Sequence, residues 1–448
     1  MSAALADRVA GPVFTPADAG YAEEILAHNR AVVHTPDVVV GASSADDVVE
    51  AVRFAREHGY PVSVQSTGHG AHAPVSEGLF ITTSRLTGVR VDPERRVAVI
   101  GAGARWGAVL AAAAEHGLAA IPGASGSVGV VGYLLGGGLG PLARSHGFSS
   151  DYVESFRVVT GHGELVQASA DENEELYWAL RGGKIGLGVV TELTLRLVQL
   201  DGLYAGSLFF DEPHIEAALR AWVEWTPDAD PRVTTSVAII RFPDLEFVPE
   251  VFRGRRMLSV RFAFPGDAAE GERLAAPLRA AAPTHLDALG ELPPAEMARI
   301  HSDPDQPGPS WGRGMMLDHI DQDFATRLLG LLGAGTDLPF IATEIRHLGG
   351  ATAHDVDGGS AVGGREPGFT FMLIGAPVPD LFDAVLPAAA QHVVDELDPW
   401  VSARTTINFA SYPSEHSAWK SAWTEETFAR LAAVRSRHDP EGVFPYGV

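Results

Sequence analysis

The chain has no cysteine, and only two of its 448 residues, Lys184 and Lys420, are lysines. Without cysteine there is no disulfide, no zinc–thiolate site, no iron–sulfur cluster and no thiol nucleophile. Basic residues are also outnumbered by acidic ones, 33 against 57, which gives a net charge of -24. Nucleic acids and anionic membrane surfaces bind clustered Lys and Arg, so we expect neither as a partner.

Long apolar runs are missing as well. No stretch of about 18 consecutive apolar residues occurs, so we expect no transmembrane helix. Residues 1–21 show neither a basic segment nor a long apolar one, so no secretory signal is visible and a cytoplasmic protein is the default expectation. With 448 residues, 46% hydrophobic and 20% charged, the chain is an ordinary globular sequence too long for one core, which predicts two domains.

Glycine is abundant, and its 49 residues gather in clusters. The first cluster is a turn at residues 66–72, STGHGAH, between an alternating strand at 62–65 and an apolar run at 79–81. Glycine on both sides of His69 permits a close approach of the backbone to a ligand. Successive N–H groups in such a turn form a concavity suited to a phosphate. The alternative is a tight hairpin with an exposed histidine.

Two further glycine clusters follow. Residues 121–140, IPGASGSVGVVGYLLGGGLG, interleave glycine with Val and Leu, which favours contact with a large flat ligand over a loose surface loop. Residues 181–191, RGGKIGLGVVT, lead into a strand at 192–197. A shorter run, GAGARWG at 101–107, resembles a truncated dinucleotide fingerprint, but it lacks the third glycine and the following acid, so we interpret it as structural.

The pattern of helices and strands changes near residue 200. Before it, a strand at 38–40, a helix at 45–58 capped by Ser44 and the strand at 62–65 form one unit, after a helical pattern at 16–31. After it, alternating strands and amphipathic helices indicate an α+β domain with an antiparallel sheet. The expected strands are 203–210, 233–241, 257–264 and 369–375; the expected helices are 212–225, 267–280, 321–333 and 379–397; long loops are expected at 301–314 and 349–368, and the tail is expected to hold a strand at 405–409 and a helix at 425–438.

The chain resembles the FAD-linked oxidases of the vanillyl-alcohol-oxidase (p-cresol methylhydroxylase-type) superfamily, in particular the berberine-bridge-enzyme-like group. The resemblance rests on four motifs in family order, VSVQSTGHG, VGVVGYLLGGGLG, LYWALRGGKIGLGVVT and INFASY…RLAAVRSRHDPEGVF. It implies an α+β fold with a two-subdomain FAD-binding domain, formed by residues 1–200 and 395–448. Residues 201–394 would form an inserted α+β substrate domain, whose antiparallel sheet covers the flavin ring.

The resemblance implies FAD as the cofactor, bound covalently through an 8α-histidyl link to His69, with His72 as the fallback. Ser125 stands where some relatives carry a cysteine, and a second, cysteinyl bond is impossible here. The pyrophosphate would lie on residues 66–71, Gly188 to Val190 would contact the adenine–ribose side, and Asn408 would lie near the flavin ring. No metal site is expected. The full implied cofactor-binding set is Ser66, Thr67, Gly68, His69, Gly70, Ala71, Pro122, Gly123, Ser125, Val128, Gly129, Gly132, Tyr133, Gly136, Gly137, Gly138, Gly140, Gly188, Val189, Val190 and Asn408.

The catalytic base does not carry over, because Thr406 stands where many relatives have a tyrosine. The leading candidates are Tyr133, in the glycine-rich motif, and Glu344, on an expected strand where it shares a face with Arg346 and His347 points to the other. The structural alternatives are a tyrosine of the core and an internal Glu344–Arg346 pair. His301, His347 and Tyr412 are further candidates.

The expected function is an FAD-dependent oxidase that acts on a small organic molecule of the secondary-metabolite kind. Its substrate would give a hydride to flavin N5, and O2 would reoxidise the flavin and form H2O2. The alternatives are a dehydrogenase with another electron acceptor and a flavoprotein that catalyses a non-redox cyclisation. No HExxH or GxSxG motif supports a metalloprotease or a serine hydrolase.

Overall fold

Three β-sheets follow one another along the chain in the computed structural model, which describes residues 2–184, 186–410 and 421–444. The first sheet has the order β1-β2-β4-β3. Its strands are β1 (Val13–Phe14), β2 (Val38–Gly41), β4 (Leu79–Thr82) and β3 (Val62–Gln65), and helices α1 (Ser2–Ala6), α2 (Tyr21–Glu24) and α3 (Ala45–His58) accompany them. The expected cap of α3 is present, since the Ser44 hydroxyl accepts a hydrogen bond from the Asp47 amide.

Strands β3 and β4 are parallel, with Val62 opposite Leu79. Parallel neighbours cannot be joined by a tight turn, because the chain must return to the starting edge of the sheet. Residues 66–78 make this return. The tight hairpin considered from the sequence is therefore wrong, and the glycine-flanked turn lies at the end of a parallel strand.

The second sheet is antiparallel, in the order β5-β6-β9-β7-β8. Its core surrounds two fully buried aromatic side chains, Trp106 and Phe156. The elements are β5 (Val89–Asp92), β6 (Val97–Gly101), β9 (Val189–Arg196), β7 (Val153–Val159), β8 (Leu165–Ser169), α4 (Trp106–Ala114), α5 (Val130–Leu134), α6 (Ala143–His146) and α7 (Glu174–Leu180). The second glycine cluster surrounds helix α5, and the third runs from the end of α7 into β9.

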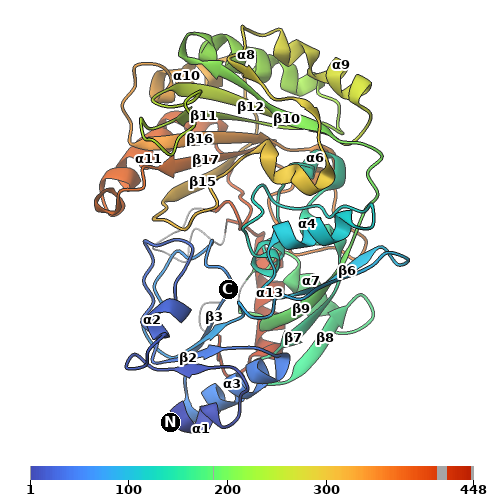
Figure 1. Ribbon diagram of the computed structural model, residues 1–448, viewed down its shortest axis with the longest axis vertical. Helices are drawn as coiled ribbons and strands as arrows, with labels where there is room; N and C mark the ends of the chain where they lie inside the picture. The colour runs from blue at the N-terminus through green and yellow to red at the C-terminus, as the bar shows by residue number, and fades with distance from the viewer. Residues whose placement is uncertain (1, 185, 411–420, 445–448) are drawn as a thin grey trace.

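The third sheet is wholly antiparallel, as the sequence predicts, in the order β13-β10-β12-β11-β16-β17-β15, with β14 beside β10. One face packs against helices α8, α9, α10 and α11, and the other face lies toward the first two sheets (Figure 1). The elements are β10 (Tyr204–Asp211), β11 (Thr234–Arg241), β12 (Arg256–Phe264), β13 (Leu286–Asp287), β14 (Gly290–Glu291), β15 (Gly312–Leu317), β16 (Phe340–His347), β17 (Phe369–Gly375), α8 (Ile215–Trp225), α9 (Ala268–Arg279), α10 (Gln322–Leu332) and α11 (Val385–Leu397).

The C-terminal part of the described chain returns to the first two sheets. The Val62 amide donates a hydrogen bond of 2.8 Å to the Val443 carbonyl, and Val443 and Phe444 are buried in the core beneath α3. Helix α13 (Glu425–His438) has the predicted bounds, and its Arg430 pairs with Glu175 of α7 at 2.8 Å. No helix among the described residues combines the length and the apolarity that crossing a bilayer requires.

Two local predictions are wrong, and two more are wrong in part, since β15 begins at Gly312 inside the expected loop and α11 begins only at Val385. The helix expected at 16–31 is reduced to α2, Tyr21–Glu24, because Gly20 before it is left-handed at φ 95° and the amides of His28 and Asn29 after it bond to the turn at Thr67 and Gly68. The strand expected at 405–409 is irregular and ends in a turn, where the Phe409 amide bonds to the Thr406 carbonyl. In both segments contacts distant in sequence override the local pattern.

Candidate active site

The turn after β3 places His69 against two other segments. Its ring stacks on that of His28, with centroids 3.5 Å apart and an interplanar angle of 17°. Its Nε2 lies 3.2 Å from the Ser127 hydroxyl. Burial, with the nearby His28 and Arg105, lowers the pKa of His69 to about 4. The imidazole is therefore neutral at physiological pH, and a neutral imidazole has a free lone pair with which it can act as a nucleophile.

Backbone contacts fix this turn in place. The His28 amide donates to the Thr67 carbonyl at 2.9 Å, and the Ser66 hydroxyl donates to the Ala102 carbonyl at 2.9 Å. Gly68 has φ 70°, and a Cβ there would lie 2.6 Å from Ala27 Cα. Only glycine fits this position, which explains the glycine that precedes the histidine.

The second glycine cluster packs directly on the first and on the tail. A Cβ on Gly129 would lie 3.2 Å from the Thr67 side chain, and one on Gly136 would lie 2.1 Å from Asn408 Oδ1. A Cβ on Gly132 or Gly70, by contrast, would meet nothing within 4 Å. Most glycines of the second cluster thus serve close packing. Gly132 in this cluster and Gly70 in the first cluster instead border open space that a ligand can fill.

Lys184 joins the three segments that the sequence singled out. Its Nζ donates to the Gly132 carbonyl at 2.9 Å and to Asn408 Oδ1 at 2.7 Å, and Asn408 Nδ2 donates to the Tyr133 carbonyl at 2.8 Å. Burial lowers the pKa of Lys184 to about 8. Sequence reasoning missed this role, although the available signal was that Lys184 is one of only two lysines and stands inside the third glycine cluster.

Other residues of the implied cofactor-binding set hold the three glycine clusters in place by packing and hydrogen bonds. Gly140 lies against the Pro122 carbonyl, where a Cβ would be 1.8 Å away, and the Val128 carbonyl accepts from the Trp106 amide at 3.1 Å. The Ser125 hydroxyl lies 2.8 Å from that of Ser127. The side chains of Val189 and Val190 are buried in two different cores, and Gly188 is tight against Val158, so this stretch can offer a ligand only its backbone.

Tyr133 is enclosed by glycine backbone. A Cβ on Gly123 would lie 2.9 Å from its ring and one on Gly138 2.4 Å from it, and the Trp106 ring meets it edge-on at 5.9 Å. Its hydroxyl is buried and makes no well-formed hydrogen bond among the described residues, although the Ser149 side chain is close enough to lower its pKa. Burial raises the pKa of Tyr133 to about 12, although the charge of Arg346 acts in the opposite direction.

Glu344 lies at the centre of a buried ionic cluster on the inner face of the third sheet. Its carboxylate is 2.6 Å from Arg261, 2.8 Å from Arg346 and 3.4 Å from His301 Nε2. Burial alone would raise the pKa of Glu344, but the charges of Arg346 and Arg261 outweigh it and hold the pKa well below its usual value. The internal Glu344–Arg346 pair, which the sequence left as the alternative to catalysis, is present.

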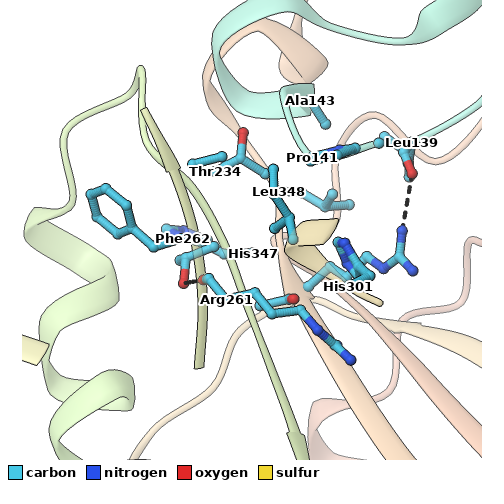
Figure 2. Close-up of a pocket in the computed structure, with 15 residues that line it drawn as sticks. Leu139, Pro141, Ala143, Thr234, Arg261, Phe262, His301, His347 and Leu348 are labelled. Atoms are coloured by element: carbon cyan, nitrogen blue, oxygen red, sulfur yellow. Dashed lines mark hydrogen bonds between the residues drawn. The ribbon is translucent and has the colours of Figure 1, made fainter. Parts of the chain in front are cut away.

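A small cavity separates this cluster from the end of the second glycine cluster. It measures about 20 Å3 and lies between residues 139–141 and the strands that carry Arg261 and Arg346 (Figure 2). Arg346 Nη1 spans the gap with a hydrogen bond of 3.1 Å to the Leu139 carbonyl. The third sheet is thereby tied to the segment that holds Tyr133.

The remaining base candidates are less available for proton transfer. His347 Nε2 lies 2.8 Å from Arg144 Nη1, and burial and the charge of Arg144 lower the pKa of His347 to about 3. Its lone pair is therefore already engaged. Tyr412 lies outside the described residues. Over those residues, no group of three or more His, Cys, Asp or Glu side chains could hold a metal ion.

Comparisons with known proteins agree with this geometry. The model of the FAD binding domain matches residues 36–169. An FAD-dependent monooxygenase of Penicillium roqueforti is 32% identical over 216 residues, 47% of this chain and 42% of that protein, so the chain spans well under half the length of this relative.

Two solved structures match nearly the whole chain. One is 6-hydroxy-D-nicotine oxidase of Arthrobacter nicotinovorans, with a TM-score of 0.84 and 22% identity over 97% of this chain and 96% of that one. The other is the BBE-like 1 protein of Physcomitrella patens, with a TM-score of 0.85 and 17% identity over 100% and 99%. Both share the fold described above.

Proposed function

We propose that this chain, which has the FAD-binding domain and the fold of the berberine-bridge-enzyme-like oxidases of the vanillyl-alcohol-oxidase superfamily, is an FAD-dependent oxidoreductase that oxidises a small organic substrate and uses O2 as acceptor. When bound, FAD would accept a hydride from the substrate and return the electrons to O2, which yields H2O2. The observation that best supports this proposal is that His69 is neutral and lies in a turn where Gly70 borders open space, as Gly132 does in the second glycine cluster. The relatives reported above are named for redox reactions, so the cyclisation alternative has no support.

Residues 1–200 and 395–448 would hold the FAD, and residues 201–394 would cover it. In this proposal His69 carries the covalent bond to the flavin, since its imidazole is neutral and its ring is oriented by His28 and Ser127. The backbone of the turn at 66–71 would receive the pyrophosphate. The absence of cysteine restricts the protein to a single covalent bond.

Tyr133 and Glu344 would share the handling of the substrate proton. Burial outweighs the charge of Arg346 and raises the pKa of Tyr133 to about 12, so its hydroxyl is protonated in the resting protein. Tyr133 would accept the substrate proton as the tyrosinate, the form that the nearby charge of Arg346 favours. Glu344 is a weak base because its pKa is so low, and its part would be to hold Arg346 and Arg261 in position. We therefore assign Tyr133 as the proton acceptor and Glu344 as a positioning residue.

The proposal is tested first on the cofactor. Protein precipitated with acid should stay yellow, and the flavin-bearing peptide should contain His69. A His69→Ala variant should lose the covalent flavin, whereas His72→Ala, the matched control three residues away, should keep it. Colourless wild-type precipitate would refute covalent attachment, and purified protein without any FAD would refute the function itself.

The second test concerns O2 as the electron acceptor. A metabolite screen scored by H2O2 release should find a substrate that bleaches the flavin under anaerobic conditions. Admission of O2 should then restore the oxidised spectrum within the turnover time. Reoxidation far slower than turnover, together with fast reoxidation by an artificial dye, would make the protein a dehydrogenase instead.

A further inference from the structure

Three polar side chains form a row across the inner face of the third sheet. In the strand registers Arg261 of β12 lies opposite Ser236 of β11, and Ser236 lies opposite Arg346 of β16. Their neighbours Val237 and Phe262 pack into the core beneath the helices. Since successive residues of a strand point to opposite faces, the row faces the glycine-rich segment at 139–141.

The charges of this row do not cancel. Two guanidinium groups, those of Arg261 and Arg346, share the single carboxylate of Glu344. Burial and the charge of Arg261 lower the pKa of His301, so His301 adds no positive charge of its own at neutral pH. The buried groups of the cluster thus carry one net positive charge, and the other carboxylate that acts on Arg346, that of Asp303, is exposed. A buried charge that is not fully compensated is costly unless an anion joins it.

Several atoms around the same cavity are buried and lack hydrogen-bond partners among the described residues. They are Arg261 Nε, Ser236 Oγ and His301 Nδ1. The side chains of Arg261 and His301 are only 7% and 4% exposed. Another arginine of the same strand shows the usual state, since Arg256 donates to two backbone carbonyls and has no nitrogen that is both buried and unpartnered among the described residues. Buried donors are normally satisfied, so this convergence points to a missing acceptor.

The cavity limits the size of that acceptor. Its volume of about 20 Å3 corresponds to about one water molecule. A phosphate, with four oxygens around its phosphorus, is too large to enter without rearrangement. The cavity therefore admits only the small charged end of a ligand. The apolar side chains of Leu139, Ile300 and Leu348, which border it, suit a hydrocarbon body that continues beyond the cavity.

We propose that this cavity receives the carboxylate of an apolar carboxylic acid, and that such acids are the substrate class. Arg261 Nε and the Ser236 hydroxyl would donate to its oxygens, and the carboxylate would balance the second guanidinium. The identification of the ligand as substrate rests on the proposed oxidoreductase function. The anion site itself rests only on the row, its charge and its unpartnered donors.

The test uses benzoate and its neutral isostere benzamide, titrated calorimetrically into the purified protein, with flavin content read from the absorbance of the same sample. Benzoate should bind and benzamide should bind at least ~10-fold more weakly, as expected for a charged hydrogen bond. Arg261→Met should weaken benzoate binding by ~10–100-fold and leave benzamide unchanged, and Arg261→Lys should recover part of the loss. Arg256→Met is the matched control on the same strand and should bind benzoate as the wild type does.

Equal affinities for benzoate and benzamide, or no benzoate binding up to ~10 mM, would overturn the anion site. Wild-type benzoate affinity in a folded Ser236→Ala, Arg261→Met double variant would overturn it too. A protein that binds benzoate at this site but contains no FAD would refute the proposed function and leave the site standing. A protein that contains FAD but binds benzamide more tightly than benzoate would refute the anion site and leave the proposed function standing.

Discussion

The rate at which the apoprotein attaches FAD covalently should hardly depend on pH down to about pH 5.5. Attachment requires the neutral imidazole of His69, whose pKa is lowered to about 4, mainly by burial. At pH 5.5 a group with that pKa is about 97% neutral, whereas a histidine with the ordinary pKa of about 6.5 is only about 9% neutral. The expected change between pH 7.5 and 5.5 is therefore a few per cent, against a roughly tenfold fall for an ordinary histidine.

Apoprotein from riboflavin-depleted cells would be mixed with FAD across this pH range and quenched in acid at intervals. The flavin retained by the precipitate then gives the rate of attachment. Work below pH 5.5 is avoided because the sequence pI is near 5.0, where the protein loses its net charge. Circular dichroism at each pH checks that the protein stays folded. A half-maximal rate near pH 6.5 in folded protein would refute the argument from burial.

Four further outcomes follow from the same geometry. Gly138→Val should lower stability by roughly 2–4 kcal/mol, because Gly138 has φ 85° and a Cβ there would lie 2.4 Å from the Tyr133 ring; an unchanged urea midpoint would contradict this. Gly132→Val should instead keep the midpoint and lose flavin, since its Cβ would enter open space; full flavin occupancy would show that no cofactor lies there. Tyr133→Phe should slow anaerobic flavin reduction by roughly 10²–10⁴-fold and leave flavin content unchanged, and reduction at the wild-type rate would exclude it as the base. The Tm of Lys184→Met should decrease relative to the Tm of the wild type as pH rises from 8 to 10.5. Burial lowers the pKa of Lys184 to about 8, so in this window the unfolded chain binds a proton that the folded one has released; a constant difference in Tm would contradict it.

Many helices and strands could be predicted from the sequence because they depend on patterns of neighbouring residues. The four strands whose bounds the sequence predicted in the third sheet lie within one residue of those bounds, for example β17 at Phe369–Gly375. The short strands β13 and β14 were not predicted, and β15 begins inside a predicted loop. Helix α3 carries its own cap signals at Ser44 and Gly59, and α13 has the predicted bounds. These features depend on residues that are close together in the sequence, so local sequence patterns are enough to predict them.

Several properties of the site depended on contacts between distant residues. Gly132 and Gly138 look equivalent in the sequence, yet one borders open space and the other is tight against Tyr133. The segment at 405–409 reads as a strand, but the folded chain bends it so that Asn408 reaches Lys184 and the Tyr133 carbonyl. Such choices are made by packing, and no local pattern encodes them.

The sequence by itself determined that the protein has glycine-rich turns around a histidine, an antiparallel sheet after residue 200 and no thiol chemistry. Only the tertiary structure decided the protonation state of His69, because burial and the stacked His28 set its pKa. The same holds for the net charge of the cluster around Glu344, since two strands and a loop far apart in the chain bring its members together. Electrostatic free energies depend on distance and burial, and the order of residues along the chain specifies neither until the chain has folded.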